Sequence, residues 1–314
     1  MSALAGWPGV VDSSIQVGGR RVRVLRADGA ADAQGEPQLL VHGLGGSAVT
    51  WIEVMTGLAK HGPVVAVDLP GFGRTRAHAS DPLTVDGYVA FVLQVADKLG
   101  WERFTLHGNS MGGLIATLIA AEHPERVERL VLVSPALPPR SPVNLLLPAR
   151  ATIHGMAPIA WSSLTAAALG VVGMAGPELD ARRNREMLRL IYPDPDGVDR
   201  AVLKLMARDF AGDDEHIGRE RRRALLTALR SIAQLWTNPR RAWRAIDAIE
   251  APTLLLGGTR DALVPAKVLR AVLARRADWQ GEVLDDRRHA LMMEDPDGYL
   301  AAFTRWRDGS QRAA

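Results

Sequence analysis

Cysteine is absent from the 314-residue sequence, so disulfide bonds and thiolate metal ligands are both excluded. Lysine is scarce: only four of the 38 basic residues are lysines, and the other 34 are arginines. The net charge is nevertheless only +3, because 35 acidic residues offset them. The densest basic run, RERRRALLTALR at 219–230, also carries an apolar stripe, which is typical of a solvated helix face. We therefore expect no nucleic-acid partner.

Long hydrophobic runs are also missing. The apolar stretch at 161–176 is too short and too rich in small residues to cross a bilayer. Residues 1–14 lack a basic region followed by a long apolar stretch, so we expect no signal peptide, no membrane span and a cytoplasmic location. The histidines are scattered without metal-binding spacing, and the glycine-rich segments lack the pattern of a phosphate-binding loop. We expect neither a metal nor a cofactor.

The remaining composition, 47% hydrophobic and 23% charged residues, is ordinary for a globular protein with a large core. Short apolar runs in the first third are continuous rather than alternating, as in parallel strands that are covered on both faces. These runs lie at 37–43, 63–71 and 103–108, and segments with helical spacing lie at 47–62, 85–100 and 110–123. We predict an α/β fold with a mostly parallel sheet and helices on both faces.

This pattern breaks after Pro135. Residues 137–246 contain helix-like pieces and no convincing strand, and the strand-helix alternation resumes at 251–261. The simplest interpretation is one α/β core, formed by residues 1–136 and 247–314, that is interrupted by a helical insertion at 137–246. Insertions of this size beside strand ends are often caps over a site.

The segment LHGNSMGGLIATLIA at 106–120 contains a serine between two glycines. A strand, the sequence G-x-S-x-G and a helix, in this order, are typical of a nucleophile elbow. The turn is so tight that only small residues fit at positions 108 and 112, and both are glycine. The following helix directs N–H groups toward developing negative charge. We predict that Ser110 is a nucleophile.

A serine hydroxyl is a poor nucleophile unless a base takes its proton. Of the eight histidines, His289 follows a late strand and lies in a predicted loop, DDRRHALMMEDP. By contrast, His42 and His107 stand beside glycine turns and are expected to pack in the interior. The sequence therefore favours His289 as the base.

The acid that orients this histidine is expected directly after a strand. Asp261 meets that condition in TLLLGGTRD, and the chain order Ser110, Asp261, His289 is the order of a nucleophile-elbow hydrolase. Asp285 and Asp286 remain alternative partners for His289.

The segment HGLGGS at 42–47 supplies a further element. Its glycines keep the approach to a site open, so the backbone N–H groups of Leu44 and Met111 are expected to form an oxyanion hole. The segment DLPGFG at 68–73 is expected to be structural, with Asp68 bonding local backbone.

Together these motifs resemble the α/β-hydrolase superfamily. The resemblance covers roughly residues 10–136 and 247–310, and it rests on HGLGGS, DLPGFGRT, HGNSMGG, GGTRDALVP and RRHALMMEDP in this order. It implies a cap formed by residues 137–246. It also implies the following roles: Ser110 as nucleophile, Asp261 as acid, His289 as base, and the amides of Leu44 and Met111 as the oxyanion hole.

A serine at the elbow argues against the dehalogenase and epoxide-hydrolase branches, which carry an aspartate there. We expect a serine esterase that cleaves carboxylic ester or lactone bonds of a largely apolar small molecule through an acyl-enzyme. The cofactor-free haloperoxidases usually have an aromatic residue where this chain has Leu44. Two alternatives stay open: a carbon–carbon hydrolase of ring-cleavage products, whose members usually have tryptophan at the position of Ala290, and a small-molecule receptor with a residual triad.

The sequence says little about the substrate pocket or the oligomeric state. Four side chains are candidates for substrate contact, although ordinary packing would explain each of them as well: Trp51, Met156, Trp161 and Trp236.

Overall fold

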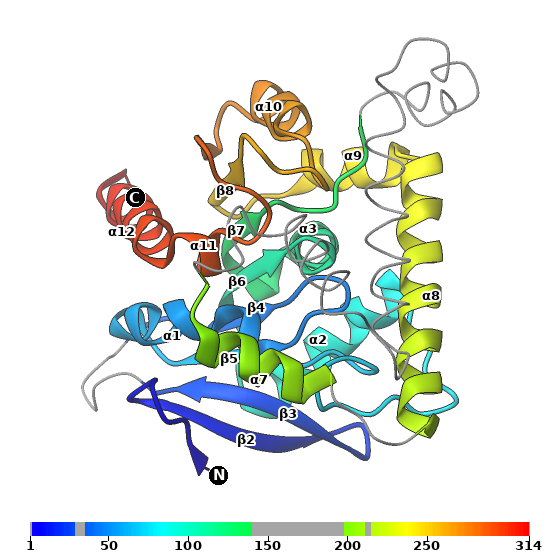
Figure 1. Cartoon of the computed structure of the whole chain (residues 1–314). Coiled ribbons are helices and arrows are strands. Elements are labelled where there is room, and N and C mark those ends of the chain that lie inside the picture. The colour runs from blue at the N-terminus through cyan, green and yellow to red at the C-terminus, as the bar shows by residue number, and fades with distance from the viewer. Residues whose placement is uncertain (1, 29–34, 140–197, 211–214, 314) are drawn as a thin grey trace.

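A computed structural model of the chain describes residues 2–28, 35–139, 198–210 and 215–313 (Figure 1). Within these ranges, nine strands form one sheet in the order β1-β2-β3-β5-β4-β6-β7-β8-β9. The strands are β1 (Ser2–Ala3), β2 (Val10–Val17), β3 (Arg20–Ala27), β4 (Gln38–Val41), β5 (Val64–Val67), β6 (Phe104–Asn109), β7 (Val127–Val133), β8 (Thr253–Gly258) and β9 (Gln280–Leu284). The pairs from β1 to β5 are antiparallel, and every pair from β5 to β9 is parallel.

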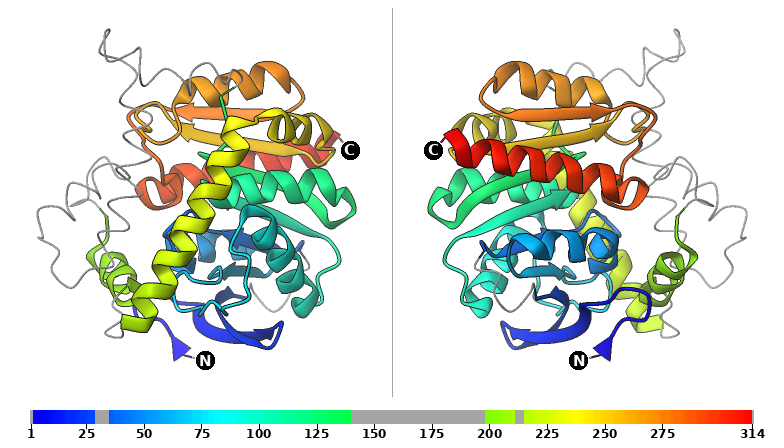
Figure 2. Two further views of the ribbon diagram at one scale, coloured as in Figure 1. Left: turned by 90° about the vertical axis from the view of Figure 1, so that its right-hand side faces the viewer. Right: turned by 90° about the vertical axis from the view of Figure 1, so that its left-hand side faces the viewer.

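Helices cover both faces of this sheet, as the views from its two sides show (Figure 2). One face carries α2 (Val85–Leu99), α3 (Met111–Glu122), α8 (Glu215–Thr237), α9 (Arg240–Ala248) and α10 (Ala266–Arg275). The other face carries α1 (Ile52–Leu58), α7 (Arg200–Phe210), α11 (Leu291–Glu294) and α12 (Pro296–Ala313). Short 3-10 turns complete the chain at η1 (Ala48–Trp51), η2 (Ala59–His61) and η3 (Pro124–Arg126).

The central strands are buried on both faces, which explains their continuous apolar sequences. In β4, Leu39 and Val41 pack against the α2–α3 side, while Leu40 packs against the α1–α12 side. Successive side chains along a β-strand point to opposite faces of the sheet. The predicted α/β fold with a mostly parallel sheet is therefore confirmed.

The described helices between 198 and 248 pack directly on this core. In α8, Ala224, Leu225 and Ala228 join the hydrophobic cluster on the α2–α3 side, and the Ser231 hydroxyl accepts the Val85 N–H at 3.0 Å. The predicted boundary between 246 and 247 falls inside α9. Residues 140–197 lie outside the described residues, so the division into core and cap stays a prediction.

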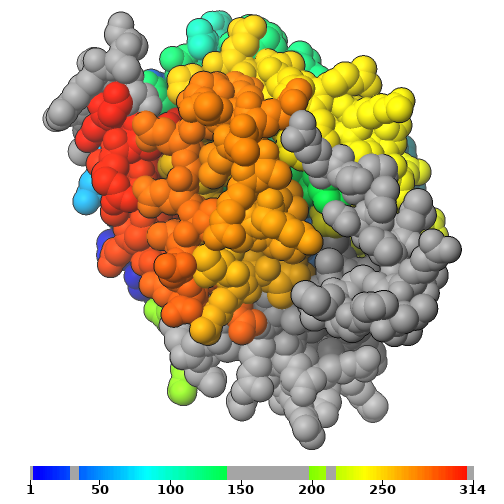
Figure 3. Space-filling model, turned by 90° about the horizontal axis from the view of Figure 1, so that it is seen from above, coloured from blue at the N-terminus to red at the C-terminus, as the bar shows by residue number. Residues whose placement is uncertain are grey.

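The C-terminal elements meet on the upper surface of the molecule (Figure 3). There, the region of α10 lies between α12 on one side and α8 and α9 on the other. Among the described residues, no helix is long and apolar enough to cross a membrane.

Two glycines allow β6 and α3 to approach the neighbouring backbone. A Cβ atom on Gly108 would lie 2.3 Å from the carbonyl oxygen of Gly112, and one on Gly112 would lie 2.2 Å from the carbonyl oxygen of Val41. Both distances are well inside van der Waals contact, so any larger residue must displace backbone.

We therefore expect Gly112→Ala to lower the free energy of unfolding by about 3 kcal/mol, because a buried backbone cannot yield to the added methyl group. Gly309→Ala is the matched control, since Gly309 lies in α12, is exposed and has open space around it. It should stabilise the protein by up to about 1 kcal/mol through helix propensity. Urea unfolding measures both, and equal effects of the two substitutions would contradict the crowding at Gly112.

Candidate active site

Ser110 lies at a sharp turn between β6 and α3, with φ 54° and ψ −117°. A residue with a side chain adopts such a conformation at a cost of about 1–3 kcal/mol, so the surroundings must hold it. The Ser110 N–H donates to Val133 at 3.0 Å, and the Ser110 carbonyl accepts from Leu114 at 3.1 Å and Ala136 at 2.8 Å. Both backbone groups are therefore fixed, and the residue is half-buried.

The loop after β4 approaches this serine. A Cβ atom on Gly43 would lie 3.0 Å from the Cβ of Ser110. The Gly43 carbonyl accepts the Gly46 N–H at 3.0 Å, which closes the turn that contains Leu44. Met111 begins α3, and N–H groups in the first turn of a helix have no partner within the helix. Of the two amides predicted to form an oxyanion hole, one thus lies in the loop that approaches Ser110 and the other in the residue that follows it.

His42 stabilises this loop through hydrogen bonds of both ring nitrogens. Its Nδ1 donates to the Gly43 carbonyl at 2.7 Å, and its Nε2 accepts the Leu69 N–H at 3.0 Å. Complete burial lowers the pKa of His42 to about 4, so the ring is neutral and has one donor and one acceptor. The ring serves as a brace for the loop, consistent with the interior position expected for it.

His289 and Asp261 lie side by side in the loop before α11 and the loop after β8. The His289 Nδ1 is 2.8 Å from Asp261 Oδ2, and both residues are about 5–6% exposed. The second carboxylate oxygen, Oδ1, accepts the N–H groups of Leu263 at 2.8 Å and Val264 at 2.9 Å. Burial alone would raise the pKa of Asp261, but the charge and hydrogen bond of His289 and the hydrogen bond from Val264 outweigh it, so the pKa lies below its usual value.

The alternative acids occupy different positions. Asp285 and Asp286 are exposed, and Asp286 forms an ion pair with Arg260 at 3.0 Å. The structure thus brings Asp261, rather than either of these residues, to His289.

Two cross-links join the loops of the site. The Arg260 N–H donates to the Arg287 carbonyl at 2.9 Å, which connects the loop of the acid to the loop of the histidine. The Asn109 Nδ2 donates to the carbonyls of His289 and Val133, each at 3.1 Å. Asn109 is not among the site residues predicted from the sequence, although a polar side chain at the end of a buried strand, next to Ser110, is the signal that could have indicated its role.

The candidates for substrate contact lie in different environments. Trp51 is fully buried in the core on the α1–α12 side, where its ring lies edge-on to His107 at 6.3 Å and Tyr299 at 6.1 Å. This is the environment of a core side chain. The indole of Trp236 donates to the Ala136 carbonyl at 2.9 Å, and the Ala136 N–H in turn donates to the Ser110 carbonyl. Met156 and Trp161 lie outside the described residues.

A buried ion network lies beside the loop after β4. Arg23 donates to Asp68 at 3.4 Å, to Asp209 at 3.2 Å and to Asp12 at 3.0 Å, and Ser47 also donates to Asp209 at 2.8 Å. Asp68 accepts the N–H groups of Ala48 at 2.6 Å and Arg74 at 2.7 Å, so it bonds more than the local backbone expected for it. Through Asp209, α7 is tied to the end of the HGLGGS loop.

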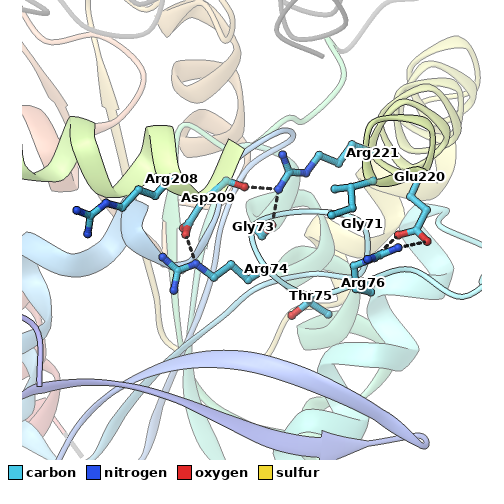
Figure 4. A pocket seen from close by; sticks show the side chains of 10 residues that line it. Gly71, Gly73, Arg74, Thr75, Arg76, Arg208, Asp209, Glu220 and Arg221 are labelled. Atoms are coloured by element: carbon cyan, nitrogen blue, oxygen red, sulfur yellow. Dashed lines mark hydrogen bonds and ion pairs between the residues drawn. The ribbon is translucent and has the colours of Figure 1, made fainter. Parts of the chain in front are cut away.

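A cavity of about 290 Å³, to whose lining Asp209 contributes, lies between α7, α8 and the segment 71–76 (Figure 4). Arginines line much of it, but acids face them: Arg74 pairs with Asp209 at 2.8 Å, and Arg76 pairs with Glu220 at 2.8 Å. Arg221 donates to the carbonyls of Gly73 and Asp209. These pairs hold the helices to the core. Among the residues that the structure describes, no three histidine or acidic side chains form a metal-binding group.

Comparison with known proteins agrees with this architecture. A family model described as the alpha/beta hydrolase fold matches residues 37–164. A putative lipase from Acinetobacter baumannii AYE superposes with a TM-score of 0.77 over 98% of this chain and 94% of its own, at 20% identity. The chain therefore has the α/β-hydrolase fold, and residues 37–164 match the model of that family.

Two sequence relatives of this chain differ in the reactions that their names give. A pimeloyl-[acyl-carrier protein] methyl ester esterase from Neisseria meningitidis is 28% identical over 280 residues, which cover 87% of this chain and 93% of the relative. A 2-hydroxymuconate semialdehyde hydrolase from Pseudomonas sp. strain CF600 is 41% identical over only 105 residues, or 32% of this chain and 37% of the relative. Of these two matches, the one that covers most of both chains is with the esterase.

The buried network should matter for stability. We expect Arg23→Met to lower the free energy of unfolding by about 3–5 kcal/mol, because it leaves Asp12, Asp68 and Asp209 without their shared cation. Arg305→Met is the matched control, since its ion pair with Glu282 is exposed, and its effect should stay within about 0.5 kcal/mol. Urea unfolding at pH 7 compares them, and a small effect at Arg23 would show that the network contributes little.

Proposed function

We propose that this α/β-hydrolase is a serine esterase that cleaves carboxylic ester or lactone bonds through an acyl-enzyme. The observation that carries the proposal is the hydrogen bond between His289 and Asp261, in loops that are tied to the strained turn at Ser110. A histidine whose Nδ1 is engaged by a buried carboxylate has its Nε2 available as a base.

In the proposed reaction, His289 Nε2 removes the proton from the Ser110 hydroxyl while the serine oxygen attacks the acyl carbonyl. Asp261 holds the ring in the required tautomer and stabilises the imidazolium. The N–H groups of Leu44 and Met111 bind the negative oxygen of the tetrahedral intermediate. The alcohol leaves with the proton from His289, and a water molecule that His289 activates then releases the acid from Ser110.

An ester substrate is favoured by the esterase relative that matches along most of the chain. The apolar sequence at 144–161, in the expected cap, favours a largely apolar acyl or alkyl group.

A carbon–carbon hydrolase is the second candidate, because the match to the Pseudomonas enzyme, although short, has the higher identity. Ala290 stands where that branch usually carries tryptophan, which favours the esterase. A receptor with a residual triad would differ from both by very slow turnover.

Ser110→Ala should abolish hydrolysis of p-nitrophenyl esters, because no other group can form the acyl-enzyme, and it should leave the fold intact. A series from short to long acyl chains, tested beside a ring-cleavage dienone, measures this. Turnover of esters by the wild type and its loss in the variant would support the esterase. Fast cleavage of the dienone alone would favour the carbon–carbon hydrolase, and ester turnover retained in Ser110→Ala would contradict the proposed nucleophile.

Asp261→Asn should lower kcat by about 10⁴-fold, because the amide cannot stabilise the imidazolium or hold the correct tautomer. Asp286→Asn is the matched control, since Asp286 lies in the histidine loop but is exposed and pairs with Arg260. Its kcat should remain within about twofold of the wild type, as expected for a surface ion pair. If Asp286→Asn caused the larger loss, the assignment of the acid would be wrong.

A further inference from the structure

We propose that Glu294 is a positioning residue for His289, a role that rests on the proposed esterase function. Its carboxylate accepts two backbone hydrogen bonds, from Arg288 N–H to Oε2 at 2.8 Å and from Ala290 N–H to Oε1 at 2.8 Å. These are the residues immediately before and after His289. One side chain therefore holds the backbone on both sides of the histidine.

The carbonyl of His289 is held as well, by Asn109 at 3.1 Å. The backbone around the histidine thus has three fixed polar groups, while Asp261 fixes the ring. Both oxygens of Glu294 are needed for its two bonds, since each oxygen accepts one N–H group. A glutamine could accept only one of them and would direct an N–H₂ group at the other.

Capping of α11 alone would not require this arrangement. A glutamate that reaches back to the N–H group at the start of its helix is a common cap, and the bond from Ala290 is of this kind. The bond from Arg288 lies outside the helix, on the far side of His289. Because of this second bond, Glu294 fixes the chain both before and after His289. We call this pair of hydrogen bonds the Glu294 bracket.

The charge of Glu294 also acts on His289. Two carboxylates interact with the histidine: Asp261, which bonds its Nδ1, and Glu294. The nearby side chains of Arg287 and Asp295 pair with each other at 3.0 Å. Burial raises the pKa of Glu294, against the opposing effects of its two N–H donors and of His289. A negative Glu294 stabilises positive charge on the His289 ring, so neutralising Glu294 removes a favourable interaction with the imidazolium that forms in the proposed reaction.

The experiment compares wild type, Glu294→Gln, Glu294→Asp and Asp295→Asn with a p-nitrophenyl ester over a range of pH. Asp295 is the matched control, because this neighbouring half-buried carboxylate accepts the Gly298 N–H at 3.0 Å and bonds neither Arg288 N–H nor Ala290 N–H. Thermal unfolding by circular dichroism establishes that each variant is folded. Ser110→Ala in the same assay tests the proposed function separately.

For Glu294→Gln we expect kcat to fall about 10–100-fold, as for a misplaced catalytic group, with KM within about threefold of the wild type. The acid limb of its kcat/KM profile should move to lower pH, an effect that a weakened helix cap would not produce. Glu294→Asp, which keeps the charge and both oxygens, should recover part of kcat, and Asp295→Asn should stay within about threefold.

Two results would overturn the role of Glu294: a kcat and an acid limb like those of the wild type in Glu294→Gln, or an equal loss in Asp295→Asn. If Glu294→Gln does not fold, Glu294→Asp tests the role instead. A kcat and an acid limb unchanged by the shorter side chain would overturn the role of Glu294. A reduced kcat at unchanged KM would support it. Esterase activity that survives Ser110→Ala would instead refute the proposed function, so the two failures are distinguishable.

Discussion

The strained turn at Ser110 is the constraint on which the rest of the candidate site depends. A serine at φ 54° is unfavourable in isolation, and its cost of about 1–3 kcal/mol must be met by contacts elsewhere. Those contacts are the hydrogen bonds of its own backbone to β7 and α3, together with the close approach of chains that Gly108 and Gly112 permit. The result is a serine whose backbone is held at a fixed position between β6 and α3.

The neighbouring loops are fixed by side chains that do not react. The neutral ring of His42 braces the loop after β4, the amide of Asn109 ties the elbow to the histidine loop, and Arg23 joins α7 to the loop end through Asp209. Each of these groups is buried, and each bonds backbone or a paired charge, which is the condition for a polar group in an interior. Donors and acceptors held in this way need no rearrangement when charge develops, and such preorganisation is a principal source of catalytic stabilisation.

The sequence by itself determined the architecture and the elbow. Continuous apolar runs are sufficient to indicate strands buried on both faces, because an exposed face would require alternation. Some glycines meet local requirements of the backbone, so a few adjacent residues are enough to predict them. These are the hairpin turn at 18–19, the left-handed Gly100 and the glycines around Ser110. The candidate histidine and acid could be listed for the same reason, since each follows a recognisable strand.

Only the tertiary structure decided which of the listed residues meet. The choice of Asp261 over Asp285 and Asp286 depends on how β8 and β9 are placed in the sheet, and adjacent positions in the sequence give no such information. The bracket formed by Glu294 depends likewise on how the chain bends between 288 and 294, and the bond between Asp209 and Arg23 joins residues 186 positions apart. Local patterns report backbone conformation and burial, whereas these contacts arise from packing between elements that are distant along the chain.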